Sequence, residues 1–528
     1  MKKHPRILTL LWIALLAGLV LLGCQVQPTA TPIPSWPTAT PGATAELTSP
    51  TPTLPSAEAR REIIIIHTND EHGFLLPTED ADFYYGGAAY AMASWLKKGY
   101  DPRKTGSNVL LVSAGDNWTG PAISTWFRGE STTEVMNAMG YRLSVIGNHE
   151  FDFGQEVLKK RIKEASFPYL AANLYREGTE ELVDFVRPYI IIPINGVKVG
   201  IIGLALKETP LVTAQKNLKG LTFGDYEPAL RKWVPIMRKE GAQIIIVEGH
   251  ICAQDLLVLA GRVQDLGITL FEGGHCHQSR TTSFKDMLID SGSCYWKDYV
   301  ITKLVYDLNK GQVVEKHQEL VDVLTPKGAK VPLDPTVAAL LKKWQARTET
   351  VLGEEIGYTA TGLAQESEAL HHLLVDSWLW AYPQADIAIS NLGGFRQSLD
   401  KGPITLGDIV SVLPFENELY ELEVTGKEIS HTLSTVGSAI VVGGLVHDAQ
   451  GNLIVSKRQA PLQEKETYHL LITDYLYNNR KYPFRLYDKD PYPTSISWRQ
   501  PVIDWIRAQH SSPEHPLEEI IAAKFGVR

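Results

Sequence analysis

Five short polar motifs hold the side chains of this sequence that could do chemistry. Each contains a glycine and each follows a run of apolar residues: Asp70-Glu71-His72-Gly73, Gly115-Asp116-Asn117, Gly147-Asn148-His149-Glu150, Gly249-His250 and Gly274-His275-Cys276-His277. Together they supply the carboxylate, amide and imidazole ligands that a hydrolytic centre with two metal ions needs. The series therefore predicts such a centre.

The predicted metal ligands come from all five motifs: Asp70, His72, Asp116, Asn148, His250, His275 and His277. Asp70 and His72 are two residues apart, and in an extended chain this spacing places both side chains on one side. The same reasoning applies to His275 and His277. The Asp116 carboxylate has two oxygens and can bridge two ions. Mixed nitrogen and oxygen ligands suit Zn, Mn, Fe or Co without choosing among them.

The sequence contains four cysteines: Cys24, Cys252, Cys276 and Cys294. They show no CxxC spacing, so no disulfide framework is predicted. Cys276 lies between two of the predicted ligands, which raises the alternative of a thiolate ligand. Because alternation along a strand would point Cys276 away from its neighbours, we predict a small buried residue instead.

Strands that alternate with helices are predicted around the motifs. Apolar runs typical of buried strands occupy residues 63–66, 109–112, 190–194, 199–202, 244–247 and 268–271. Helix-like stretches such as 88–98 and 156–165 lie between them. This alternation indicates an α/β layered architecture. The motifs stand where strands end, which is the usual place for sites in open α/β sheets.

A linking helix is predicted near residues 334–353, followed by a second domain. Asp334 can cap this helix, Pro335 suits its first turn and Gly353 suits its end. Its apolar stripe would consist of Val337, Leu340, Leu341, Trp344 and Val351.

The N-terminus has the pattern of a bacterial export signal. Cationic residues precede an apolar run at 7–22, which ends in Leu21-Leu22-Gly23-Cys24 and resembles a lipobox. We therefore predict a lipoprotein signal peptide at 1–23, lipid on Cys24 and a disordered Pro/Thr-rich tether at 24–60. This predicts an exported lipoprotein on the outer face of the cell membrane, at the cell surface or in the periplasm. An ordinary signal peptide and an uncleaved anchor are the alternatives.

Composition restricts the class of partner. The chain has 528 residues and a formal net charge of −9, with no long basic run. Nucleic-acid backbone binding needs a cationic face, so it is not expected. A small phosphorylated substrate remains compatible with this charge, because metal ions supply local positive charge.

Three of the motifs, in their wider context, resemble the signatures of the secreted 5′-nucleotidase family of metallophosphoesterases. They are His67-Thr68-Asn69-Asp70-Glu71-His72-Gly73, Gly147-Asn148-His149-Glu150-Phe151-Asp152 and Gly273-Gly274-His275-Cys276-His277. The second domain of that family is similar at Asn391-Leu392-Gly393-Gly394-Phe395-Arg396 and Pro414-Phe415-Glu416-Asn417. The resemblance extends over about residues 61–480. It implies a layered α/β/β/α catalytic domain at 61–330, a linking helix at 331–353 and a smaller α/β substrate-binding domain at 354–528.

The resemblance also implies a role for each ligand. One divalent ion would be held by Asp70, His72, Asp116 and His277, and the other by Asp116, Asn148, His250 and His275. Metal-activated hydroxide would attack the phosphorus atom. His149 would stabilise the transition state or protonate the leaving oxygen, with Asp152 orienting its ring.

Substrate contacts are implied in the second domain. Arg396 would hold a phosphate, Asn391 would make a polar contact, Phe415 and Tyr475 would stack on a base, and Asn417 would reach the edge of that base. Two features depart from the family pattern. Glu366 and the His371-His372 pair stand where an arginine and a Gly-Asn pair are usual, and residues 479–482 replace a Gly-Gly-Asp-Gly stretch. Arg480 or Lys481 could then take over phosphate binding.

The sequence thus predicts an extracytoplasmic phosphohydrolase of nucleotide catabolism that removes phosphate from nucleotides with two divalent ions. A 2′,3′-cyclic-nucleotide phosphodiesterase, a UDP-sugar hydrolase and a relative acting on sulfur esters are alternatives on the same centre. A non-enzyme alternative is a lipid-anchored nucleotide-binding receptor. The metal, the base and the oligomeric state are not predicted.

Overall fold

A computed structural model describes residues 59–525 of the chain, which belong to one compact unit. The predicted signal peptide, Cys24 and nearly all of the predicted tether lie outside the described residues. Within the described part of the chain, no helix combines the length and the apolar character needed to cross a membrane.

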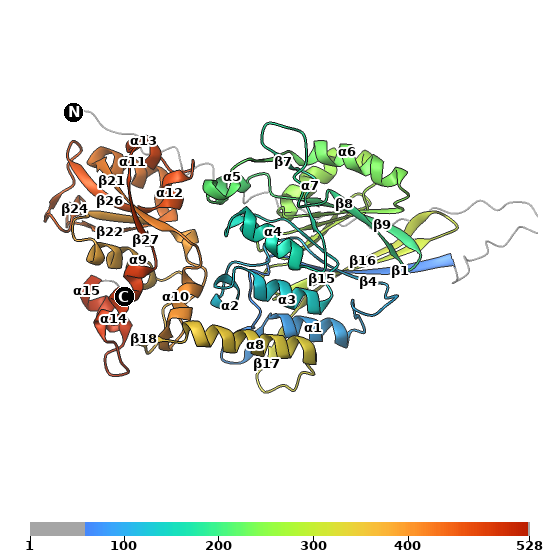
Figure 1. Ribbon diagram of the computed structural model, residues 1–528, viewed down its shortest axis with the longest axis horizontal. Helices are drawn as coiled ribbons and strands as arrows, with labels where there is room; N and C mark the ends of the chain where they lie inside the picture. Colours follow the sequence, from blue (N-terminus) through green and yellow to red (C-terminus); the bar gives the residue numbers. More distant parts are fainter. Residues whose placement is uncertain (1–58, 526–528) are drawn as a thin grey trace, which may run out of the picture. The chain divides into compact units, whose positions relative to one another are not determined.

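Two six-stranded sheets form the N-terminal lobe (Figure 1). The first has the order β16 (Gln312–Asp322), β15 (Asp298–Asp307), β1 (Arg60–Thr68), β4 (Val109–Ser113), β5 (Leu143–Val145) and β6 (Tyr169–Leu170). The second has the order β13 (Arg280–Phe284), β14 (Met287–Ser291), β12 (Leu270–Gly273), β11 (Ile244–Gly249), β9 (Val197–Leu204) and β8 (Tyr189–Ile194). Strands β1 and β4 are parallel neighbours, as are β11 and β12. The motifs that follow these four strands therefore meet at the carboxyl edges of the sheets.

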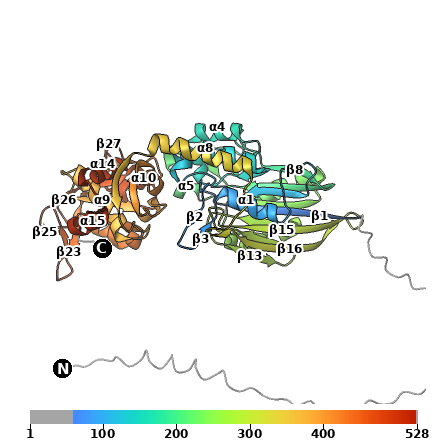
Figure 2. The same ribbon diagram turned by 90° about the horizontal axis from the view of Figure 1, so that it is seen from below.

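The two sheets pack face to face and are covered by helices on both outer sides. Between them lies an apolar layer that includes Ile63, Ile65, Ile246 and Leu270. The outer face of the first sheet packs against α1 (Ala88–Lys97), α3 (Glu130–Met139), α4 (Gln155–Glu164) and α8 (Pro335–Leu352), and that of the second against α6 (Tyr226–Lys239) and α7 (Ala253–Arg262). Figure 1 shows these layers one above another, and Figure 2 looks onto the helical layer of α1 and α8 from below. The predicted α/β/β/α architecture is confirmed.

Helix α8 leads from the first lobe to the second. The Asp334 side chain accepts hydrogen bonds from the backbone N–H groups of Thr336 and Val337, so it caps the helix as expected. Val337, Leu341 and Trp344 are buried. The predicted stripe is wrong at its last member, because Val351 is 47% exposed and Leu352 is buried instead. The spacing 337, 341, 344, 352 keeps one helical face, and Val351 lies beside it.

The C-terminal lobe is a second α/β unit. Its five-stranded sheet has the order β22 (Ile440–Gly443), β19 (Ile387–Asn391), β26 (Thr467–Thr473), β21 (Glu418–Thr425) and β27 (Tyr492–Ser497). One apolar cluster joins this sheet to α9 (Glu368–Ala381), α10 (Leu406–Val412), α14 (Gln500–Gln509) and α15 (Leu517–Phe525). A second cluster joins it to α11 (Gly426–Val436), α12 (Asp474–Asn478) and α13 (Phe484–Tyr487).

Smaller elements complete both lobes. In the N-terminal lobe they are α2 (Ala122–Thr125), α5 (Thr209–Val212), the pair β7 (Leu174–Arg176) and β10 (Leu221–Phe223), and the small sheet of β2 (Thr78–Glu79), β3 (Phe83–Tyr85) and β17 (Leu324–Pro326). In the C-terminal lobe they are the pair β18 (Glu355–Thr359) and β20 (Gly402–Thr405), and the small sheet of β23 (Leu445–His447), β24 (Leu453–Val455) and β25 (Ala460–Pro461).

Candidate active site

Most of the predicted ligands lie in tight turns just after the strands. Five of them have left-handed backbone: φ is 52° at Asp70, 47° at His72, 57° at Asp116, 71° at His275 and 53° at His277. The expectation that extended chain aligns these pairs is therefore wrong. The side chains converge because left-handed residues turn the chain sharply at the sheet edge, and non-glycine residues adopt this conformation at a cost that often marks functional sites.

Two of the motif glycines are required by close approach. A Cβ on Gly147 would lie 2.2 Å from Asp116 Oδ1, and one on Gly274 would lie 3.1 Å from Asp70 Oδ2. Each glycine thus lets the backbone of one motif come against a carboxylate of another. This explains why glycine stands beside the ligands in the sequence.

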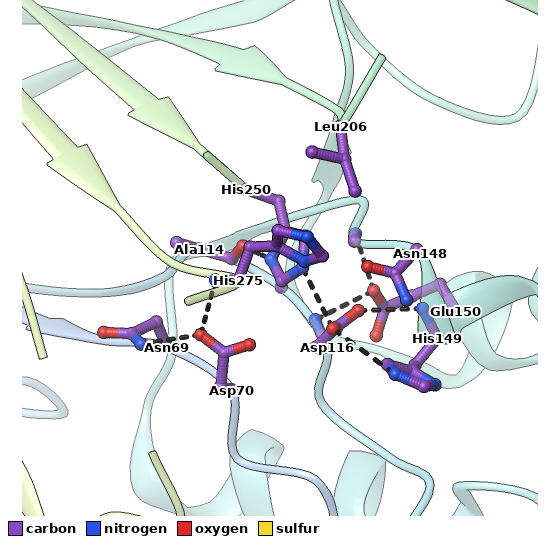
Figure 3. Close-up of polar contacts among 12 residues, drawn as sticks. Asn69, Asp70, Ala114, Asp116, Asn148, His149, Glu150, Leu206, His250 and His275 are labelled. Atoms are coloured by element: carbon purple, nitrogen blue, oxygen red, sulfur yellow. Dashed lines mark hydrogen bonds and ion pairs between the residues drawn. The ribbon is translucent and has the colours of Figure 1, made fainter. Parts of the chain in front are cut away.

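The first half of the cluster is built around Asp70 (Figure 3). Its Oδ2 accepts hydrogen bonds from Asn69 Nδ2 at 2.7 Å and from the backbone N–H of His275 at 2.8 Å. Its Oδ1 lies 3.3 Å from His277 Nε2 and 3.8 Å from His72 Nε2. His72 donates from Nδ1 to the carbonyl of Thr119 at 3.0 Å, which leaves its Nε2 facing the carboxylate.

The second half is built around Asp116. Its Oδ2 lies 2.9 Å from His250 Nε2, and its Oδ1 accepts a hydrogen bond from the backbone N–H of His149 at 2.8 Å (Figure 3). His250 donates from Nδ1 to the carbonyl of Ala114 at 2.8 Å, and its ring lies 5.1 Å from that of His275. Asp116 Oδ2 is also 3.9 Å from His72 Nε2, so this carboxylate joins the two halves.

These side chains fit divalent cations. Three overlapping groups have ligand atoms within 4.8 Å of one another: Asp70, His72 and His277; His72, Asp116 and His149; and Asp116, His250 and His275. Asn148 Oδ1 is buried and accepts no hydrogen bond. The carbonyls that accept from Nδ1 of His72 and His250 orient both rings with Nε2 inward, as in metal-binding histidines.

The protonation of the two inner histidines differs. Burial lowers the pKa of His72 well below its usual range, and the Arg396 guanidinium adds to the effect. Burial alone would lower the pKa of His250, but the Asp116 carboxylate outweighs it and raises the pKa to about 10. Metal binding would displace that proton, because imidazole binds metal ions in its neutral form.

Two buried glutamates of the motifs hold the loops, a role that we did not predict. Glu150 accepts from the backbone N–H groups of Asp116 at 2.9 Å, Asn117 at 2.8 Å and Gly147 at 2.6 Å. Glu71 accepts from Asn117 Nδ2 at 2.9 Å. Both glutamates are visible in the sequence close to predicted ligands, but only their burial in the fold reveals that they hold the loops.

His149 projects toward the cluster from the turn after Asn148. Its Nδ1 lies 2.7 Å from Asp152 Oδ2, and its Nε2 lies 4.0 Å from Asp116 Oδ2. Burial lowers the pKa of His149, but the Asp152 and Asp116 carboxylates more than offset this and raise it overall. The ring is therefore poised to carry a proton near the cluster.

A cavity of about 370 Å³ lies between this cluster and the C-terminal lobe. From the N-terminal lobe it is lined by Asp116, Asn148, His149, Asp152, His275 and His277 among others. All five predicted substrate residues line it from the other lobe: Asn391, Arg396, Phe415, Asn417 and Tyr475. The two sets of residues are thus brought to one space.

Contacts between the two lobes position the residues of the C-terminal lobe that line the cavity. Arg396 Nη2 lies 3.4 Å from His72 Nε2, and the Phe415 ring stacks on His149 with centroids 5.8 Å apart. Trp498 donates from Nε1 to the carbonyl of Phe415 at 2.8 Å, and its backbone N–H donates to the carbonyl of Asn417 at 3.1 Å. Trp498 therefore holds the loop that carries Phe415 and Asn417, two of the three predicted base contacts.

The cavity lining also differs from expectation. Lys216, which pairs with Asp474 at 2.8 Å, lines the cavity although no motif marked it. Arg480 and Lys481 do not line it, and Arg480 faces a separate hollow with Tyr477 and Arg485. The structure thus gives no support to a phosphate contact from either of these cations.

Cys252 and Cys276 form a disulfide, with Cα atoms 5.2 Å apart. The prediction of an unpaired, buried Cys276 is wrong. It relied on strand alternation, whereas the positive φ values on both sides of Cys276 turn the chain. Because β11 and β12 are adjacent and parallel, the residues just beyond their ends are neighbours. The bond ties the loop of His250 to the loop of His275 and His277.

We expect removal of this disulfide to loosen the metal cluster. The Cys252→Ser/Cys276→Ser double variant should lose about 3 kcal/mol of unfolding free energy, as expected for a loop closed over a separation of 24 residues. Urea unfolding in the presence of chelator measures this loss, and metal retained after dialysis should also fall. Cys294→Ser, which removes a free cysteine, is the matched control. Equal stability of the double variant and the control would contradict the expectation.

Comparison with known proteins agrees with this architecture. Residues 63–279 match the family model described as calcineurin-like phosphoesterase, and residues 348–485 match that of the 5′-nucleotidase C-terminal domain. The chain belongs to the 5′-nucleotidase family of metallophosphoesterases. The homologues are 5′-nucleotidases and calcineurin-like phosphoesterases, which are phosphoric ester hydrolases, and the metallophosphoesterase family uses divalent metals.

Individual members of the family are distant. Human 5′-nucleotidase is 26% identical over 79% of this chain and 83% of its own length. Endonuclease YhcR and the trifunctional nucleotide phosphoesterase protein YfkN, both from Bacillus subtilis, are 27% and 28% identical over 81% and 74% of this chain. The matched regions span only 38% and 28% of those two longer proteins.

Solved structures share the fold. The 5′-nucleotidase precursor from Thermus thermophilus is 23% identical and superposes with a TM-score of 0.72 over 85% of this chain and 97% of its own. The sulfate thiohydrolase SoxB of the same species is 18% identical and gives 0.68 over 86% and 96%. The same fold thus occurs in proteins whose names refer to different substrates. The fold alone therefore does not determine the substrate, which depends on the residues of the site.

Proposed function

We propose that this chain is an extracytoplasmic phosphohydrolase with a dinuclear metal centre that removes phosphate from nucleotides. The observation that carries the proposal is the cavity whose one wall is the Asp/His cluster and whose other wall offers Arg396, Phe415, Asn417 and Tyr475. Its volume of about 370 Å³ lies in the range of small-molecule sites, which is about 300–1,000 Å³. A mononucleotide has a phosphate, which the wall with the Asp/His cluster and Arg396 could bind, and a flat base, which the aromatic residues of the other wall could contact.

Seven side chains would hold the two ions. Asp70, His72, Asp116 and His277 form one set, and Asp116, Asn148, His250 and His275 the other. Divalent ions bound there would lower the pKa of a water molecule and polarise a phosphoryl oxygen. The mixed donor set suits Zn, Mn, Fe or Co.

The remaining residues of the cavity position the substrate and move its proton. Arg396 approaches His72 Nε2 to 3.4 Å, so its guanidinium can pair with a phosphate beside the ions. The Asp152 contact to Nδ1 leaves His149 Nε2 facing the cavity, where it can protonate a leaving oxygen or donate to the transition state. Phe415 offers a face on which a base can stack.

The N-terminal sequence and the disulfide both support a location outside the cytoplasm. The lipobox-like segment predicts export and lipid attachment at Cys24. The Cys252–Cys276 disulfide is the kind of bond that persists in oxidising compartments. The proposed localisation is therefore the outer face of the cell membrane.

A small substrate is favoured over a polynucleotide, although one relative is named an endonuclease. The chain is acidic, with a formal net charge of −9, and a polynucleotide backbone needs a cationic track. The intact Asp/His cluster with His149 also argues against a receptor that only binds nucleotides.

Phosphate release tests the proposal. Metal-loaded protein should release phosphate from AMP, and chelator should abolish the release until Mn²⁺ or Zn²⁺ is restored. 2′,3′-cyclic AMP and UDP-glucose in the same panel test the alternative esters, which the trifunctional relative makes relevant. Faster cleavage of either than of AMP would shift the assignment to that ester. Absence of release from all three substrates with metal added would overturn the proposal.

Phe415→Ala tests the predicted base contact. Stacking of a base on an aromatic ring contributes about 1–3 kcal/mol, so kcat/KM for AMP should fall roughly 5- to 150-fold. Ribose 5-phosphate carries the phosphate without a base, and its kcat/KM should change little. Steady-state kinetics on both substrates measure the difference. Equal losses on the two substrates would assign Phe415 to the packing of His149 instead.

A further inference from the structure

A row of three buried carboxyl groups crosses the second sheet, on strands that lead to the Asp/His cluster. Glu248 on β11 is paired in register with Glu272 on β12, and Glu272 is paired with Asp290 on β14. Because the three strands are parallel neighbours, paired residues project from the same face. That face is the one toward the first sheet, since Ile246 and Leu270, each two residues earlier, belong to the apolar layer between the sheets.

A histidine from the opposite sheet completes the group. His67 on β1 places Nδ1 at 2.9 Å from Glu248 Oε1, and its Nε2 donates to the carbonyl of Gly273 at 2.9 Å. One ligand atom each of His67, Glu272 and Asp290 lies within 4.8 Å of the others. All four side chains have an exposed fraction of 0%. None of them belongs to the catalytic cluster proposed above.

Most of the carboxyl oxygens in this row lack hydrogen-bond donors in the described part of the chain. Four of them accept no hydrogen bond: Glu248 Oε2, both Glu272 oxygens and Asp290 Oδ1. The other two oxygens are contacted from the first sheet: Asp290 Oδ2 accepts hydrogen bonds from Thr302 Oγ1 and Gln318 Nε2, and Glu248 Oε1 faces His67 Nδ1. Buried carboxylates are found paired or on metal ions, because an isolated buried charge is very costly. Burial raises the pKa of Glu248 and Glu272 well above the usual range and that of Asp290 to about 8, so these groups hold protons in the absence of an ion. A bound divalent cation would replace those protons.

We infer that His67, Glu272 and Asp290, with Glu248 beside them, form a buried site for a third divalent ion, of the zinc or manganese class. One imidazole nitrogen with carboxylate oxygens is a donor set for such ions. The 2.9 Å between His67 Nδ1 and Glu248 Oε1 is close to the separation of about 3 Å between neighbouring ligands that lie about 2.1 Å from an ion in octahedral geometry. The ion would join the two sheets at the end of their apolar layer and would be taken up as the chain folds.

Anomalous diffraction from the full chain crystallised with ZnCl₂ tests the site directly. Data at the zinc edge should give a peak about 2.0–2.2 Å from His67 Nδ1 and from oxygens of Glu272 and Asp290. This peak is separate from any at Asp116, so the outcome does not depend on the catalytic proposal. The absence of a peak in this cluster would overturn the inference and leave protons shared among the carboxyls.

Zinc counted in solution gives the second readout. After loading and dialysis, Glu272→Gln and Asp290→Asn should each hold about one zinc fewer per chain than the wild type. Glu315→Gln, at an exposed glutamate of β16 paired with Arg60, should hold as many as the wild type. Unchanged counts in folded Glu272→Gln and Asp290→Asn would overturn the inference. Should these variants fail to fold, the wild-type anomalous map decides.

Discussion

Replacement of Asp116 by Asn should lower kcat/KM for AMP about 10³-fold and reduce the bound metal. The Oδ2 atom of Asp116 lies near ring nitrogens of both halves of the cluster, at 2.9 Å from His250 Nε2 and 3.9 Å from His72 Nε2. Its amide replacement has nearly the same shape but offers one oxygen and no charge. Loss of a single group that stabilises charge in a transition state costs about 10²–10³ in rate, and a weakened metal site adds to this.

The matched control is Asp504→Asn, an Asp-to-Asn change at an exposed position of α14. It should keep both activity and metal. Metal per chain is measured by mass spectrometry after dialysis, and circular dichroism checks that both variants fold. An Asp116→Asn protein with near-wild-type turnover would show that this carboxylate does not bridge two catalytic ions.

The positions of the chemical groups could be predicted because strand ends are visible in sequence. Apolar runs such as 63–66 and 244–247 are followed within a few residues by Asp70 and His250, and parallel strands bring their ends to one edge. The same reading predicted helix α8 and its Asp334 cap. Local signals sufficed in these cases, since each depends on only a few neighbouring residues.

Features that depend on backbone turns and on pairing between distant segments could not be predicted. Asp70 and His275 adopt left-handed φ in the turns at the sheet edge, a conformation that the propensities of Asp and His do not reveal. The Cys252–Cys276 bond needs the order of β11 and β12, which no local pattern contains. The buried row of Glu248, Glu272 and Asp290 likewise interrupts runs that otherwise read as apolar strands. In each case, a tertiary neighbour decides the role of the residue.

His149 differs from the neighbouring ligands in how it contacts Asp116. Its backbone N–H, and not its ring, donates the 2.8 Å hydrogen bond to Asp116 Oδ1. The ring instead extends into the cavity, with Nδ1 on Asp152 and its face against Phe415. An alanine at this position therefore keeps the contact that supports the cluster and removes only the group facing the substrate.

We accordingly expect His149→Ala to retain both metals and to lose about 10²- to 10⁴-fold in kcat, the usual contribution of a positioned acid or base. The Asp152→Asn variant should lose less, because the ring stays and only its orienting partner weakens. His317→Ala, at a histidine of β16 remote from the cavity, is the control. Substrates with a better leaving group should narrow the difference between wild type and His149→Ala, since a proton on the leaving oxygen then matters less. A loss that is the same for good and poor leaving groups would instead assign His149 to stabilisation of the phosphoryl oxygens, and unchanged turnover would remove it from the mechanism.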